Sequence, residues 1–161
     1  MNTYKLPGLA LAIAATLPLL AQAQDSAMAT IEVAESAEYG EYLTTAEGET
    51  LYLFVNEEAD SDEPERMTEG VREAAAPCSG GCLEAWPPVT AATVEAGEGV
   101  DEELLYTTEV NGQTQAVYNG WPLYRFQRDT APNQINGQGM GQEPNHWYIL
   151  SPEGEKIEED A

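Results

Sequence analysis

The sequence predicts a mainly β fold, namely a single small barrel- or sandwich-like domain of hairpins with an internal pseudo-repeat and long loops. Three observations support this prediction. Short segments rich in Tyr, Leu, Phe, Val and Thr are separated by turn residues. A pattern of the form G-x-x-L-Y-x-F-x-x-[E/D] occurs twice. A length of 161 residues allows one domain of ordinary size.

The two copies of the repeat lie at residues 48–57 and 120–129. In an extended chain their Tyr and Phe, two residues apart, share one face, and the Leu before the Tyr points to the other. The first copy has Leu53 between Tyr and Phe, so it is apolar on both faces, as in a central strand. The second copy has Arg125 at that position, which predicts that one of its faces meets water.

Six strands follow from the apolar segments and the turns between them. Asn111-Gly112 is the clearest hairpin turn, because both residues tolerate a positive φ. Residues 64–76 are expected to form one or two turns of helix, and residues 129–145, rich in Gly, Asn, Gln and Pro, a loop. The strands are expected near residues 39–45, 49–56, 104–110, 113–119, 122–127 and 146–151.

The N-terminus has the features of a secretory signal. Lys5 precedes an apolar run that is too short to span about 30 Å of hydrocarbon. Ala21-Gln22-Ala23 then supplies a cleavage site of the small-x-small type. We therefore expect a cleaved signal peptide at 1–23, a flexible segment at 24–32, a β-domain at 33–156 with an acidic insertion at 57–77, and an acidic tail at 157–161.

The formal net charge is −23, from 29 acidic and six basic residues. Such a charge excludes nucleic acid and anionic membranes as partners, since both would repel the chain. A hydrophobic content of 42% predicts a folded domain rather than a disordered chain. We expect the acids to form a solvated surface suited to a halophilic host, because concentrated salt screens their repulsion. An ordinary acidic periplasmic protein is the alternative.

Cys78 and Cys82 are the two cysteines of the chain. In an oxidising compartment we expect a disulfide that closes a five-residue loop and contributes about 2 kcal/mol of stability. The alternative is a reduced pair, acting in thiol redox chemistry or binding Cu(I) together with Met140 and His146.

The repeat places an acid five residues after each tyrosine, in the pairs Tyr52/Glu57 and Tyr124/Asp129. We favour a structural role, in which the acid accepts hydrogen bonds from backbone N–H groups or from the tyrosine of the other copy. The alternative is that both pairs converge on a shared pocket.

The three tryptophans are expected to pack in the core or in turns, and a sugar- or peptide-binding groove is the alternative for them. They are Trp86, Trp121 and Trp147.

Taken together, these segments resemble the secreted repeat family of predicted lipoproteins described by a Y-x4-D motif. The resemblance is carried by segments at residues 33–43, 48–52, 78–88, 118–129, 137–139 and 147–148. Among these, C-S-G-G-C-L-E-A-W-P-P and N-G-W-P-L-Y are the most specific. The resemblance implies an exported or surface-attached domain without an established activity. The chain departs from the pattern in having no lipid-accepting Cys, in having Glu57 in place of Asp, and in the longer insertion at 57–77.

The expected function is a non-enzymatic, disulfide-stapled binding or accessory module of the cell envelope, periplasmic or secreted and without a cofactor. Its expected partner is an unidentified envelope protein or small ligand, and no membrane insertion is expected after signal cleavage. The alternative is a thiol-redox or Cu(I)-handling accessory protein of respiratory electron transfer, with copper as its cofactor.

Overall fold

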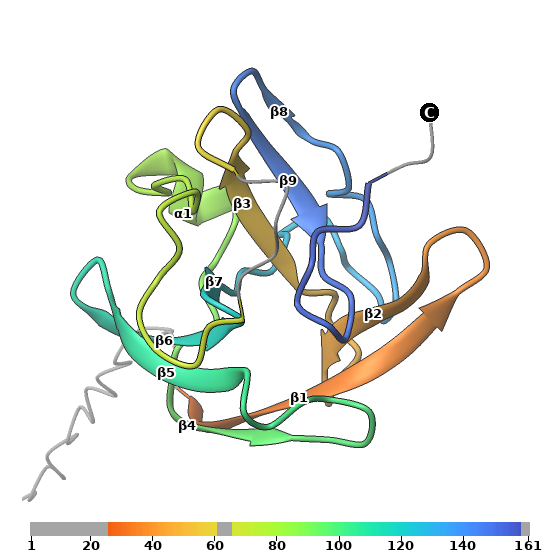
Figure 1. Cartoon of the computed structure of the whole chain (residues 1–161). Coiled ribbons are helices and arrows are strands. Elements are labelled where there is room, and N and C mark those ends of the chain that lie inside the picture. Colours follow the sequence, from red (N-terminus) through yellow and green to blue (C-terminus); the bar gives the residue numbers. More distant parts are fainter. Residues whose placement is uncertain (1–25, 61–65, 159–161) are drawn as a thin grey trace, which may run out of the picture.

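The computed structural model describes residues 26–60 and 66–158, which form a mainly β domain of three small sheets (Figure 1). We name them sheet A (β2-β1-β4), sheet B (β3-β9-β8) and sheet C (β5-β6-β7). Within these residues the sheets do not close into a barrel, so the sandwich-like form of the predicted fold class is the one that fits. The elements are β1 (Ser26–Ser36), β2 (Gly40–Thr45), β3 (Tyr52–Asn56), α1 (Gly81–Ala85), β4 (Ala91–Ala96), β5 (Leu105–Val110), β6 (Gln113–Tyr118), β7 (Trp121–Pro122), β8 (Gly141–Gln142) and β9 (Asn145–Ile149).

Sheet A contains the part of the chain that was expected to be a flexible segment. Strand β1 pairs antiparallel with β2 on one edge and parallel with β4 on the other. The expectation of a flexible segment does not fit residues 26–32, because Ser26 to Ile31 pair with β4 and the strand pairs with β2 from Ile31 onward. Residues 24 and 25 lie outside the described part. In the first half of β1 every second residue is Ala, which is a weak strand former. The sequence pattern therefore did not predict this strand.

Sheet C is built on the predicted hairpin. Asn111 and Gly112 have φ angles of 52° and 77°, as a two-residue turn of this type requires. Strands β5 and β6 pair on either side of that turn, from Leu105↔Tyr118 to Val110↔Gln113. The predictions for 104–110 and 113–119 are confirmed.

The segment 122–127 is extended but changes its partner along its length. The Tyr124 N–H donates to the Tyr52 carbonyl at 3.0 Å, and the Arg125 N–H donates to the Pro87 carbonyl at 2.9 Å. Since these partners belong to different segments, no regular ladder forms. The expectation of a strand here is wrong beyond Pro122, where β7 ends.

The two repeat copies are paired with each other at their tyrosines. The Tyr52 N–H donates to the Tyr124 carbonyl at 2.9 Å, and the reverse hydrogen bond measures 3.0 Å. This reciprocal antiparallel bridge lies between equivalent positions of the two copies. The pseudo-repeat of the sequence is therefore a pseudo-twofold arrangement in space.

The repeat supplies side chains to two separate cores. Its leucines enter an aliphatic core, whereas its tyrosines and phenylalanines enter an aromatic cluster, as the alternation predicts. Arg125, between the second Tyr and Phe, keeps 39% of its side chain exposed. The buried residues of the aromatic cluster are Tyr42, Tyr52, Cys78, Trp86, Tyr124, Phe126, Trp147 and Ile149, and the half-buried Phe54 packs against them.

No helix forms in residues 66–76, and residues 64–65 of the expected helix lie outside the described part. The Ala76 N–H donates to the Phe54 carbonyl and the Asn56 N–H to the Ala74 carbonyl, both at 2.8 Å. Strand β3 thus satisfies the backbone groups that a helix would have paired internally. No helix in the described part is long and apolar enough to cross a bilayer.

Candidate functional site

Four aromatic rings form one continuous stack in the aromatic cluster. Trp86 and Trp147 lie face to face, with ring centroids 3.9 Å apart and planes 5° apart. Phe54 covers the other face of Trp147 at 4.1 Å, and Phe126 covers the other face of Trp86 at 4.2 Å. The order of the stack is therefore Phe54, Trp147, Trp86 and Phe126.

The stack follows the pseudo-twofold symmetry of the repeat. The edge of Tyr52 meets Trp86 and the edge of Tyr124 meets Trp147, each with centroids 5.2 Å apart. Each tryptophan therefore contacts a Phe from one copy and a Tyr from the other. Stacked and edge-to-face pairs each contribute about 0.5–1.5 kcal/mol beyond the area they bury. The recurring Tyr-x-Phe of the sequence is what builds this arrangement.

Tyr52 of the first copy is joined to Asp129 of the second. The Tyr52 hydroxyl donates to Asp129 Oδ2 at 2.6 Å. Asn136 donates to Asp129 Oδ1 through its backbone N–H and its amide Nδ2, at 3.0 and 2.9 Å. Burial, and then the hydrogen bond to Asp129, raise the pKa of Tyr52 above its ordinary value, so the phenol keeps its proton at neutral pH. The pair therefore anchors the loop that follows Asp129 rather than offering a mobile proton.

The equivalent pair, Tyr124 and Glu57, does not form this contact. Burial raises the pKa of Tyr124, and its hydroxyl has the neutral Gln115 side chain beside it instead of a carboxylate. Gln115 also donates to the Leu123 carbonyl at 2.9 Å. The two phenol–carboxylate pairs therefore do not converge on one pocket.

Glu57 instead takes part in a charged cluster around Lys156. Lys156 Nζ lies 2.7 Å from Glu57 Oε2, 3.0 Å from Asp60 Oδ2 and 3.0 Å from Glu158 Oε1. Burial acts to lower the pKa of Lys156, but the hydrogen bonds to the three carboxylates outweigh it and raise that pKa. His146 Nδ1 lies 3.8 Å from Glu57 Oε1. The cluster ties the described start of the acidic insertion to the C-terminal segment.

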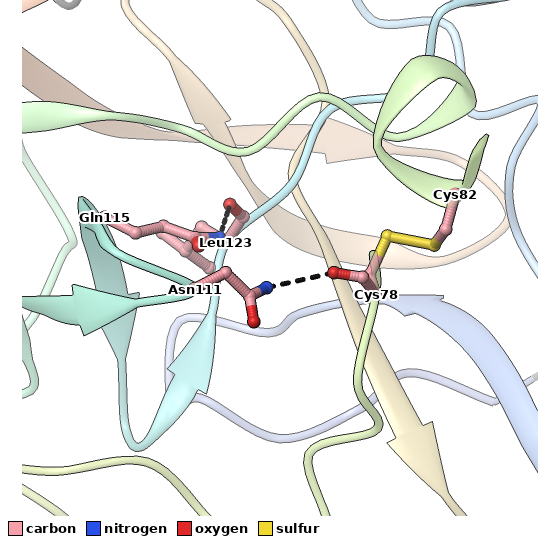
Figure 2. Close-up of a disulfide and its surroundings, with 5 residues drawn as sticks. All are labelled: Cys78, Cys82, Asn111, Gln115 and Leu123. Atoms are coloured by element: carbon pink, nitrogen blue, oxygen red, sulfur yellow. Dashed lines mark hydrogen bonds between the residues drawn. A yellow bond between two sulfur atoms is a disulfide. The ribbon is translucent and has the colours of Figure 1, made fainter. Parts of the chain in front are cut away.

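Cys78 and Cys82 form a disulfide, as expected (Figure 2). The Asn111 amide, from the β5–β6 turn, donates to the Cys78 carbonyl at 3.0 Å. The Trp86 N–H donates to the Cys82 carbonyl at 2.8 Å and ends α1. The disulfide therefore holds the helical turn that places Trp86 in the stack.

The double change Cys78→Ser and Cys82→Ser is expected to lower the free energy of unfolding by about 2 kcal/mol, the entropic value of so short a loop. Urea denaturation followed by tryptophan fluorescence measures it. Dithiothreitol should lower the stability of the wild type by the same amount and leave the double variant unchanged. Equal stability of the oxidised wild type and the variant would contradict this role.

Met140 and His146 do not join the cysteines in a copper site. The sulfurs of Cys78 and Cys82 are bonded to each other, so no thiolate is free to bind a metal. Met140 lies beside Trp147. His146 directly precedes Trp147 in β9, so its side chain points to the other face of sheet B, where it lies beside Glu57. Among residues 26–60 and 66–158, no group of three or more His, Cys, Asp or Glu is arranged to hold a metal ion.

An open groove of about 440 Å³ lies beside three of the four stacked rings, Phe54, Trp147 and Trp86. Sheet B explains its composition, because residues paired across neighbouring strands share a face. Phe54 pairs with Trp147, and Gln142 pairs with Asn145, so rings and amides line the same side. The groove is lined by Phe54, Trp86, Met140, Gly141, Gln142, Asn145 and Trp147, none of which is charged.

Two other surface hollows carry charged side chains. One, of about 270 Å³, includes Glu47, Glu49 and Arg125. The other lies between β4 and β5 and includes acidic residues from both sides, namely Glu95, Glu102 and Glu103. The groove along the stack differs from both in having only aromatic, thioether and amide side chains.

Sequence reasoning identified part of this site. Trp86 and Trp147 are 6% and 4% exposed, so they pack in the core as expected, although their edges reach the groove. Trp121 lies in the aliphatic core instead. Gln142 and Asn145 were not identified, because their approach to the rings depends on the pairing of β8 with β9, which no local signal reveals.

Comparison with known proteins gives one match. No curated protein and no solved structure matches the chain. A family model described as a secreted repeat of unknown function (Lipoprotein_15) matches residues 106–151. That range contains the second repeat copy, with Tyr124 and Asp129. The resemblance indicated by the motifs is therefore confirmed over residues 106–151, which are similar to a secreted repeat of unknown function.

Proposed function

We propose that the chain is an exported, non-enzymatic binding module of the cell envelope. The description of the matched family as secreted supports export. The Cys78–Cys82 disulfide supports an oxidising compartment, either the periplasm or the exterior. The excess of acidic residues fits an environment whose salt screens their repulsion.

The groove along the aromatic stack is the observation that carries the binding role. Ligand sites are typically concave, about 300–1,000 Å³ in volume and lined by apolar and aromatic groups with a few polar groups. The groove has this size and composition. Its rings are held in place by stacking on both sides, so it is formed before a ligand arrives.

The contacts of Glu57 and Asp129, the acids of the two repeat copies, support a non-enzymatic function. A general acid or base needs a pKa near the working pH and access to substrate. Asp129 is occupied by Tyr52 and Asn136, and the phenol of Tyr52 is buried and protonated. Glu57 is occupied by Lys156. No observation favours the thiol-redox or Cu(I) alternative, so we retain one candidate function.

Two methionine-to-lysine variants test the binding role. Met140 and Met28 are 38% and 55% exposed, but of these two only Met140 lines the groove, so Met28→Lys is the control. Thermal shifts would be measured with a panel of neutral oligosaccharides, uncharged end-capped peptides and medium-chain fatty alcohols. We expect at least one compound class to raise Tm of the wild type and of Met28→Lys. Met140→Lys should abolish that rise, because it places a charge in the groove.

Two outcomes would contradict the proposal. One is a panel in which no compound raises Tm. The other is a bound compound that is converted by the wild type, with turnover lost in Asp129→Asn or Tyr124→Phe, since this would show catalysis by the repeat residues. Mass spectrometry of the compounds after incubation measures such conversion.

A further inference from the structure

We propose that the groove binds a neutral saccharide, an inference that rests on the proposed binding function. The groove is uncharged on a strongly acidic protein. About one residue in six of this chain is acidic, and the two hollows described above contain glutamates, yet no charged side chain lines the groove. A lining without charge neither attracts nor neutralises an ionic ligand. Its occupant is therefore expected to be uncharged.

Aromatic and thioether side chains supply the apolar part of the lining. Phe54 and Met140 line the groove together with the small exposed parts of Trp86 and Trp147, which are 6% and 4% exposed. Neutral sugars present C–H groups on the faces of their rings, and these pack against aromatic and thioether surfaces while the hydroxyls stay in contact with polar groups.

Two amide side chains supply the polar part of the lining. Gln142 and Asn145 are register partners across β8 and β9, so their side chains lie side by side on the groove face. Within the described residues neither side chain is engaged in a hydrogen bond or ion pair. Each amide offers a donor and an acceptor without charge, which matches the hydroxyl groups of a sugar.

An extended peptide fits the same groove less well. Peptide recognition beside a sheet usually adds a strand to an exposed edge. The edge strand here, β8, has only two residues, Gly141 and Gln142, and leads directly into the turn at Pro144. So short an edge cannot hold the register of an added strand.

Isothermal titration calorimetry of the protein with maltohexaose, cellohexaose and N-acetylchitohexaose tests the inference. We expect at least one to bind, with a Kd that changes less than about twofold between 0.1 and 2 M NaCl, because no charge takes part. Gln142→Ala and Asn145→Ala should each raise the Kd about three- to tenfold, as expected for the loss of a neutral hydrogen bond. Gln113→Ala, an exposed glutamine on β6, is the matched control and should leave the Kd unchanged.

The outcomes separate this inference from the proposed function. If an uncharged end-capped peptide binds in the groove and no hexasaccharide does, the saccharide inference fails and the binding role stands. If a saccharide binds with the same Kd to Gln142→Ala, Asn145→Ala and Met140→Lys as to the wild type, the sugar binds elsewhere and the inference is also overturned. If no member of the binding panel binds, both proposals fail.

Discussion

Replacing Trp86 by alanine is expected to lower the free energy of unfolding by about 3–5 kcal/mol. The Trp86 ring is covered on one face by Trp147 and on the other by Phe126, and it receives the edge of Tyr52. Removing it opens a cavity where the two halves of the pseudo-symmetric arrangement meet. Surrounding rings held by strands on both sides cannot collapse fully into that space. Urea denaturation followed by far-ultraviolet circular dichroism measures the loss.

Two further variants test whether stacking accounts for the effect. Trp86→Phe keeps a flat ring between Trp147 and Phe126 and should recover more than half of the loss. Trp147→Ala should cost about as much as Trp86→Ala, because the pseudo-twofold gives both rings equivalent neighbours. A loss below about 1.5 kcal/mol for either alanine variant would show that the stack is not a main source of stability, since buried aromatic truncations ordinarily exceed it.

The Tyr52–Asp129 hydrogen bond is expected to have a coupling energy of about 1.5–3 kcal/mol, as for a buried hydroxyl bonded to a carboxylate. A double-mutant cycle of Tyr52→Phe and Asp129→Asn measures it through urea denaturation. Each single change removes one group of the 2.6 Å hydrogen bond and leaves the other group without its partner. The double variant should therefore be less destabilised than the sum of the single variants.

Tyr124→Phe is the control for this cycle. Tyr124 occupies the equivalent place in the second copy, but its hydroxyl lies beside the neutral amide of Gln115 and not beside a carboxylate. Its loss should cost about 0.5–1.5 kcal/mol, the ordinary value of a neutral hydrogen bond. A coupling energy near zero for Tyr52 and Asp129 would contradict the anchoring role of the pair.

Much of the fold follows from local patterns in the sequence. The Asn111-Gly112 turn and its two flanking strands were predicted because both turn residues accept positive φ and the alternation on each side is clear. The division of the repeat into a leucine side and an aromatic side follows from the two-residue period of an extended chain. The disulfide was predicted from cysteine spacing and the export signal.

Other elements depend on partners that are distant in the chain. Strand β1 has weak alternation and gains its order from β2 and from β4, whose Ala91 pairs with Ser26. The expected helix at 64–76 has suitable residues, yet the segment around Ala75 hydrogen-bonds to β3 instead. Tertiary partners thus overrode local propensity, as they do where propensity is weak.

The candidate site shows the same division. The sequence alone determined that Tyr52 and Tyr124 are equivalent and that the chain is acidic, and it predicted a disulfide, because these properties reside in residue types and short spacings. Only the tertiary structure decided that Asp129 meets the tyrosine of the other copy while Glu57 turns to Lys156. It also decided that rings and free amides share one groove. These outcomes depend on strand register, in which a shift of one residue moves every side chain to the other face of a sheet.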